Sequence, residues 1–189
     1  MAKVLILLIL TQLINAEFIV KSYYEIRNRN VIRQQYEESC GAASIATLLN
    51  MIDIKQYKED GILNKFKNDG NNKQNTDMVS FAQLQDVLNE IGYLATGYQI
   101  SRNIFNKINI PIIVKIEDDP RFPHFVVVLN HKGDFVKIYD PSFGEYISIK
   151  SDFYKLWDKN ENSGYALIVE PKIKRIFKLK LPTVNLIQK

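Results

Sequence analysis

The chain has 189 residues, of which 46% are hydrophobic and 24% are charged, and its formal net charge is +4. This length suits one compact domain with a proper core, and this composition excludes a disordered or fibrous protein. The charge does not indicate nucleic-acid binding, because six basic residues among the last eighteen carry it and the rest of the chain has a net charge of −2.

The first sixteen residues resemble a secretory signal peptide. Lys3 precedes a short apolar run, and the small residue Ala16 sets the expected cleavage before Glu17. The apolar run is shorter than the about 20 residues of a membrane span. We therefore expect a periplasmic or secreted protein without a transmembrane domain, although a buried first helix or an uncleaved anchor is the alternative. The expected organisation is a signal peptide at 1–16, one domain at 17–170 and a basic tail at 171–189.

Helices are expected in the first half of the domain and strands in the second. Residues 18–33 are expected to form an extended lead-in, followed by a polar turn up to Ser39, with another polar loop later, at 68–76. Apolar spacing and capping residues predict helices over residues 40–51, 55–67 and 80–91. Runs of β-branched and aromatic residues predict strands over residues 94–100, 110–117, 124–130, 134–140, 145–149 and 165–170, with a short helix at 152–157. Helices followed by an antiparallel sheet predict an α+β fold.

Cys40 is the only cysteine, so it cannot form an internal disulfide. A lone thiol in an exported protein indicates reactivity or intermolecular pairing. Its position, after the predicted N-cap Ser39, is the first turn of a helix, where free N–H groups and the helix dipole stabilise a thiolate. The small residues that follow let the helix pack closely and let a substrate reach the sulfur. A buried packing cysteine is the alternative interpretation.

A predicted hairpin supplies a base and its orienting acid. Pairing the strands about a turn centred on Lys132 places His124 directly opposite Asp140, on the apolar face of the hairpin. Directly opposed side chains are close enough for an imidazole–carboxylate hydrogen bond, and a register slip of two residues is expected to separate them. Asn130, Asp118 and Asp119 are then the alternative orienting residues.

Three ordered motifs resemble the bacteriocin-processing, double-glycine cysteine peptidase family. They are RQQYEESCGAA at residues 33–43, PHFVVVLN at 123–130 and VKIYDPSFG at 136–144. The resemblance implies a papain-like fold in which N-terminal helices pack on a C-terminal antiparallel sheet. It also implies roles for Cys40 as nucleophile, His124 as base, Asp140 as its orienter and Gln34 as an oxyanion-hole donor. Spacing alone leaves the adjacent Gln35 open as that donor.

The resemblance implies cleavage of a peptide or protein after small residues such as a Gly-Gly pair, without a metal or organic cofactor. Many family members continue into transporter domains, whereas this sequence has no further apolar spans and no phosphate-binding loop motif. It therefore resembles the stand-alone exported branch, whose members accompany secretion or biofilm-fibre systems. Two alternatives remain open: a catalytically silent peptide-binding module, and a thiol acyltransferase or amidase.

Overall fold

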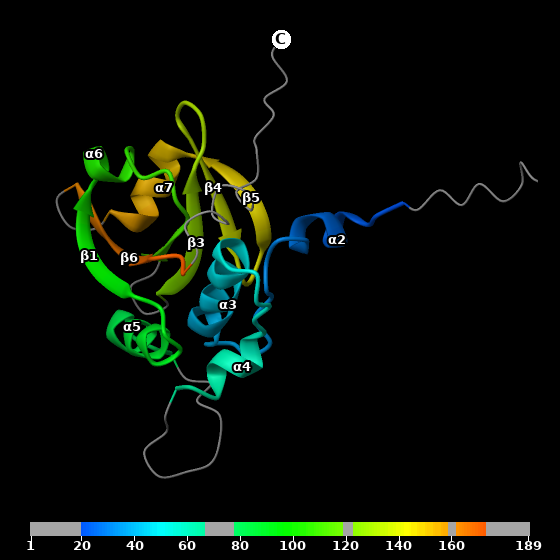
Figure 1. Cartoon of the computed structure of the whole chain (residues 1–189). Coiled ribbons are helices and arrows are strands. Elements are labelled where there is room, and N and C mark those ends of the chain that lie inside the picture. The colour runs from blue at the N-terminus through cyan, green and yellow to red at the C-terminus, as the bar shows by residue number, and fades with distance from the viewer. Residues whose placement is uncertain (1–19, 67–77, 119–122, 159–161, 173–189) are drawn as a thin grey trace, which may run out of the picture.

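The computed structural model describes residues 20–66, 78–118, 123–158 and 162–172 (Figure 1). Its helices are α2 (Tyr23–Asn28), α3 (Cys40–Ile52), α4 (Glu59–Leu63), α5 (Phe81–Glu90), α6 (Arg102–Phe105) and α7 (Lys150–Trp157). Its strands are β1 (Ala95–Ser101), β2 (Ile112–Ile116), β3 (His124–Asn130), β4 (Phe135–Asp140), β5 (Gly144–Ile149) and β6 (Ser163–Val169). The predicted α+β class is confirmed.

The strands form one six-stranded sheet in the order β1-β6-β2-β3-β4-β5. Every pairing in it is antiparallel, and β6 pairs with both β1 and β2. The central strand β3 therefore begins beside the end of β4 (Figure 1). His124, the first residue of β3, and Asp140, the last residue of β4, thus lie at the same end of the sheet.

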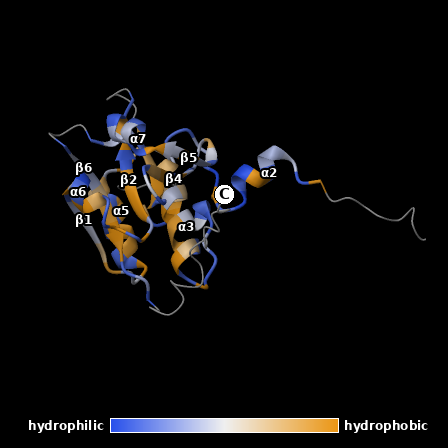
Figure 2. Cartoon of the chain, turned by 90° about the horizontal axis from the view of Figure 1, so that it is seen from above, coloured by the Kyte–Doolittle hydropathy of each residue, from blue (hydrophilic) through white to orange (hydrophobic). Residues whose placement is uncertain are grey.

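Helices cover both faces of the sheet. The side chains of a strand alternate between the two faces, so alternate residues of β3 belong to different cores. Phe125 and Val127 of β3 belong to a core that they share with α3, α4 and α5. Val126 and Val128 belong to a second core on the other face, with Phe153 and Trp157 of α7. Figure 2 shows hydrophobic residues gathered along α3 and the central strands. The central strands are thus buried on both sides.

Helix α3 is the most deeply buried of the described helices, because small or apolar residues occupy most of its positions. Its first ten residues are buried, as is its last residue, Ile52. The predicted end at Met51 is one residue short. Helix α5 begins with the capping box that its sequence contains, in which the side chain of Ser80 accepts from the Gln83 backbone and the Gln83 side chain accepts in return.

Some local predictions are wrong. The lead-in contains α2, whose start has a capping box between Ser22 and Glu25 that the sequence does show. The weak helix predicted over 55–67 is reduced to the single turn of α4. The short α6 was not predicted, although Ser101 caps it.

The β3–β4 hairpin has a different register from the predicted one. Val128 pairs with Ile138 instead of Val136, so the strands are shifted by two residues. The turn is centred on Gly133, which adopts a left-handed φ of +65° that glycine accommodates without strain. A five-residue connection between Asn130 and Val136 replaces the tighter turn predicted at Lys132.

Residues 1–16, the loop 68–76 and most of the basic tail lie outside the described residues, so the structure does not address those predictions. Among the residues that it does describe, none of the helices has both the length and the apolar character needed to cross a membrane.

Candidate active site

Cys40 is the first residue of α3, and its thiol is free and only 2% exposed. The backbone N–H of Phe125, at the start of β3, donates to Sγ over 3.5 Å. The sulfur thus lies where the N-terminus of α3 meets the start of β3. Both the orphan N–H groups of the first helical turn and this N–H stabilise negative charge on sulfur.

Gly41 allows this close approach of α3 to its neighbours. A Cβ at position 41 would lie 2.6 Å from Cγ2 of Val79 and 2.9 Å from Cδ2 of Leu84, both closer than real contacts allow. The prediction that the small residues after Cys40 let the helix pack closely agrees with this geometry.

We expect Gly41→Ala to lower the free energy of unfolding by about 1–3 kcal/mol, because the added methyl group overpacks a buried contact. Chemical denaturation measures the change. Gly61→Ala is the matched control: a Cβ there meets no atom within 4 Å, and alanine in a helix is favoured over glycine by about 0.5–1 kcal/mol. Equal stability of Gly41→Ala and the wild type would show that Val79 and Leu84 move aside without cost.

The structure brings His124 and Asp140 together. Nε2 of His124 lies 2.9 Å from Oδ1 of Asp140. The expected direct opposition is wrong, because continuing the observed register places Asp140 opposite Val126. A shift of two residues keeps both side chains on the same face, so the pair meets diagonally. The expectation that such a slip would separate them is therefore wrong as well.

Asp140 is held in place by the turn that follows it. The backbone N–H groups of Ser142 and Phe143 donate to the same Oδ1 atom over 2.7 Å and 3.0 Å. The carboxylate is 1% exposed. Two backbone donors and the imidazole compensate the cost of burying this carboxylate, and they fix its orientation toward His124.

The surroundings of His124 raise the pKa of its imidazole and so favour the protonated form. Burial lowers its pKa, but the hydrogen bonds and charges of Asp140 and Cys40 outweigh burial and raise the pKa from 6.5 to about 9. Because Nε2 contacts Asp140, Nδ1 is the ring nitrogen left for the thiol. An imidazolium beside the sulfur favours the thiolate form of a cysteine.

Gln34 bridges the turn before Cys40 and the turn after Asp140. Its Nε2 donates to the carbonyls of Tyr36 and Glu37 over 3.0 Å and 2.8 Å, and its Oε1 accepts from the Ser142 hydroxyl over 2.8 Å. Both amide hydrogens are therefore engaged, so donation to an oxyanion requires one of them to be shared or released. The oxyanion role of Gln34, like the choice between Gln34 and Gln35, stays a prediction.

Two residues of this network were missed or misread from the sequence. Ser142 was not predicted as a site residue. Its place two residues after Asp140 is nevertheless typical of a turn in which a backbone N–H donates to the aspartate side chain. Ser39 does occupy the N-cap position, but its side chain makes no capping bond. Its hydroxyl instead donates to Oε1 of the buried Glu59 over 2.5 Å.

The alternative orienting residues lie elsewhere or lack the contact. Asn130, at the far end of β3, donates to the carbonyls of Phe105 and Ile108. Asp118 is exposed at the rim of the same pocket as His124. Asp119 lies outside the described residues. Asp140 is thus the acid that contacts the imidazole.

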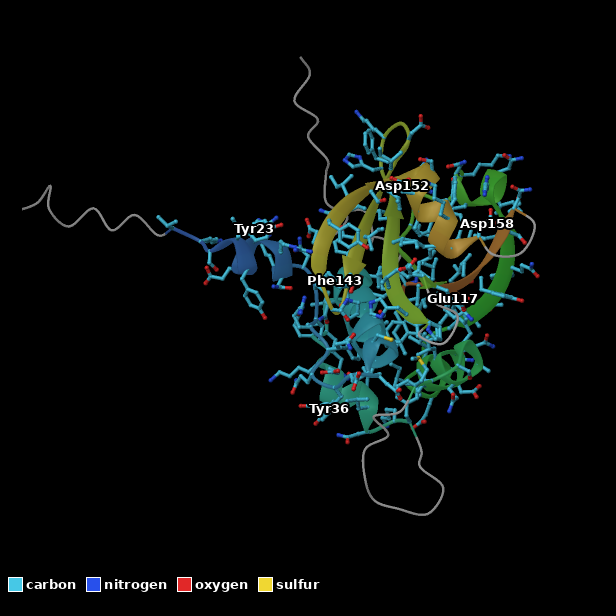
Figure 3. All side chains as sticks on the ribbon, turned by 180° about the vertical axis from the view of Figure 1, so that it is seen from behind. Tyr23, Tyr36, Glu117, Phe143, Asp152 and Asp158 are labelled. Carbon is cyan, nitrogen blue, oxygen red and sulfur yellow. The ribbon has the colours of Figure 1, made fainter. Side chains whose placement is uncertain are left out.

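A pocket of about 470 Å³ opens onto these residues. Cys40, His124 and Asp140 line it together with acidic and apolar residues. The acidic ones are Glu37, Glu38 and Asp118, and the apolar and aromatic ones include Ile116, Phe143, Tyr146 and Leu156. Figure 3 shows Phe143 and Glu117 at the same end of the sheet.

A helix-borne cysteine facing a strand-borne His–Asp pair is the arrangement of a papain-like cysteine peptidase fold. A model of the peptidase C39 family matches residues 28–174. The chain therefore belongs to the peptidase C39 family, and the resemblance to double-glycine peptidases drawn from its motifs is confirmed.

Individual relatives agree with this assignment. The probable functional amyloid protease FapD of Pseudomonas fluorescens is 31% identical over 140 residues, which are 74% of this chain and 62% of FapD. The chain thus matches less than two thirds of the length of that relative.

Two solved structures share the fold. The peptidase domain of Streptococcus ComA, a bi-functional ABC transporter, superposes with a TM-score of 0.64 at 18% identity, covering 76% of this chain and 98% of the domain. A double glycine motif protease from an AMS/PCAT transporter, solved with a leader peptide, gives 0.59 at 23% identity, covering 75% and 90%. At these identities the likeness shows the fold alone.

Proposed function

We propose that this chain is a cysteine peptidase that cleaves a peptide or protein substrate after small residues such as a Gly-Gly pair. The observation that carries the proposal is the meeting of Cys40, His124 and Asp140 at the base of one pocket, with the His–Asp contact at 2.9 Å. Membership of the peptidase C39 family supports the same activity.

The reaction proceeds through an acyl-enzyme thioester. The Cys40 thiolate attacks the scissile carbonyl carbon, and the oxyanion that forms is held by backbone N–H groups at the start of α3 with a contribution from Gln34. The imidazolium of His124 gives its proton to the leaving amine as the C–N bond breaks. His124 then takes a proton from water, which attacks the thioester and releases the new carboxyl terminus and the thiolate.

The burial of the sulfur supports a preference for small residues. Cys40 is 2% exposed at the base of the pocket, so the backbone of the substrate has to approach closely to bring its carbonyl carbon to Sγ. A bulky side chain beside the scissile bond would hold the backbone away from the sulfur, whereas glycine has no side chain to do so.

Product analysis by mass spectrometry tests this function. The purified protein is incubated with a peptide containing a Gly-Gly pair and with a matched peptide containing Leu-Leu at the same place. We expect two hydrolysis products from the first peptide and none from the second. Equal cleavage of both peptides would contradict the specificity, and transfer of the acyl group to an added amine would indicate an acyltransferase. Absence of any product, together with an unreactive thiol toward an iodoacetamide probe, would indicate a peptide-binding module.

We also propose that the protein acts outside the cytoplasm and that its substrate belongs to a secretion or biofilm-fibre system. The signal-peptide pattern of residues 1–16 supports the location. The relative FapD, named a probable functional amyloid protease, supports the kind of substrate.

The location makes a separate prediction about the mature N-terminus. In material recovered from the exported fraction, we expect N-terminal sequencing to begin at Glu17, because Ala16 is the small residue before the cut. Replacing Ala16 by a bulky residue should block processing and leave the precursor. A wild-type protein that begins at Met1 in that fraction would favour an uncleaved anchor.

A further inference from the structure

Glu59 is a buried carboxylate that the predicted chemistry does not use. It is the first residue of α4 and is 1% exposed. In the part of the chain that the structure describes, it forms no ion pair. Burying a carboxylate costs several kcal/mol of free energy unless hydrogen bonds compensate. The groups that donate hydrogen bonds to Glu59 therefore indicate which segment of the chain it holds in place.

The two groups that donate hydrogen bonds to Glu59 belong to the loop that leads into Cys40. The backbone N–H of Gln35 donates to Oε1 and Oε2 of Glu59 over 3.1 Å and 3.0 Å. The hydroxyl of Ser39 donates to Oε1 over 2.5 Å. These contacts tie the two ends of the segment from Gln35 to Ser39 to one point on α4. Figure 3 shows Tyr36, the second residue of this segment, beside that helix.

The same loop is tied on its other side to the turn that holds Asp140. The backbone N–H of Gln34 donates to the Pro141 carbonyl over 3.1 Å, and the Gln34 side chain accepts from Ser142. The backbone of Ser142 in turn donates to Asp140. A continuous set of hydrogen bonds therefore runs from Glu59 through the loop to the acid that contacts His124.

We propose that Glu59 is a positioning residue that holds the Gln34–Ser39 loop so that Cys40 and the oxyanion donors beside it stay aligned with His124. The inference rests on the peptidase activity proposed above. Glu59 touches neither the substrate nor the reacting atoms, and it acts through Gln35 and Ser39. Both carboxylate oxygens of Glu59 serve as acceptors for these donors. A carboxamide at this place would turn an NH₂ group toward the N–H of Gln35.

The test compares Glu59→Gln with Asp60→Asn, a matched change of acid to amide at the next residue of α4. Asp60 is exposed, so its variant should keep wild-type activity. For Glu59→Gln we expect kcat to fall by about 10-fold to 100-fold, the usual effect of losing a buried hydrogen bond to a charged group, with KM changed by less than about threefold. Glu59→Asp, which keeps the charge on a shorter side chain, should recover part of the loss.

A double-mutant cycle separates positioning from simple stabilisation. Ser39→Ala should also lower kcat, and it should cost less in the Glu59→Gln background than in the wild type, because the two residues act through one contact. Thermal unfolding gives the folded fraction for each variant. A Glu59→Gln protein with wild-type kcat per folded molecule overturns the proposal, even if it melts earlier. If Glu59→Gln does not fold, Ser39→Ala alone decides: lowered kcat supports the proposal and unchanged kcat overturns it.

Failure of the peptidase activity can be told apart from failure of this inference. The rate at which iodoacetamide alkylates Cys40 reports the reactivity and placement of the sulfur without any peptide substrate. If the wild type cleaves nothing but Glu59→Gln is alkylated more slowly at the same pH, the activity is wrong and the positioning role stands. If the wild type cleaves and neither kcat nor alkylation changes, the positioning role alone is wrong.

Discussion

Replacing Cys40 by alanine is expected to remove cleavage altogether, by about 10⁶-fold or to below detection, because the variant has no nucleophile to form the acyl-enzyme. Cys40→Ser should be as inactive, since the serine hydroxyl is not ionised by an imidazole arranged for a thiol. The fold should survive both changes. Cys40 is a small residue within a helix whose buried neighbours are alanine, serine and isoleucine.

The measurement is the release of product from the Gly-Gly peptide, with circular dichroism and thermal unfolding to verify that each variant is folded. Ser151→Ala is the control variant, because Ser151 is an exposed residue of α7 that does not line the pocket. A folded Cys40→Ala protein with wild-type turnover would remove the nucleophile assignment and with it the thioester route.

Replacing Asp140 by asparagine should lower turnover by about 100-fold to 1,000-fold, less than the loss of Cys40 or of His124. The geometry explains why the loss is partial. The imidazole and the two backbone N–H groups all meet at Oδ1, and a carboxamide oxygen at that place still accepts from them. What the variant loses is the negative charge, so His124 stays oriented but its imidazolium is no longer stabilised by an anion.

The pH profile distinguishes this change from a general loss of activity. The pKa of His124 is raised to about 9, and its protonated form gives the proton to the leaving amine. The basic limb of the kcat/KM profile of the wild type should therefore lie near that pH. In Asp140→Asn the lowering effect of burial is opposed less strongly, so the basic limb should move to lower pH. A variant whose limb stays in place would show that Asp140 does not act on His124.

The same shift predicts how stability depends on pH. The pKa of His124 is 6.5 in an ordinary environment and about 9 in the fold, so the folded state binds the proton more tightly. The stabilisation is complete below about pH 6.5 and is lost as the pH rises toward about 9. The difference in unfolding free energy between the wild type and His124→Ala should shrink over that interval.

Local patterns in the sequence predicted β3 and the start of α3, although they missed α2 and α6. The strand His124–Asn130 has the predicted bounds, and α3 begins at Cys40 as expected. These predictions succeed because strand alternation and helical spacing depend on a few neighbouring residues. The shared face of His124 and Asp140 also follows from alternation alone, which is why it persists when the register changes by an even number of residues.

Only the tertiary structure decided which partners these residues have. The turn geometry at Gly133, rather than the strands themselves, sets the register and makes the His124–Asp140 contact diagonal. Ser39 has the sequence of a helix cap but bonds Glu59, which lies twenty positions away. Glu59 itself carries no local signal, because a glutamate in a short polar helix is ordinarily exposed. A buried hydrogen bond is determined by which elements meet in space, and a sequence pattern read along the chain does not contain that information.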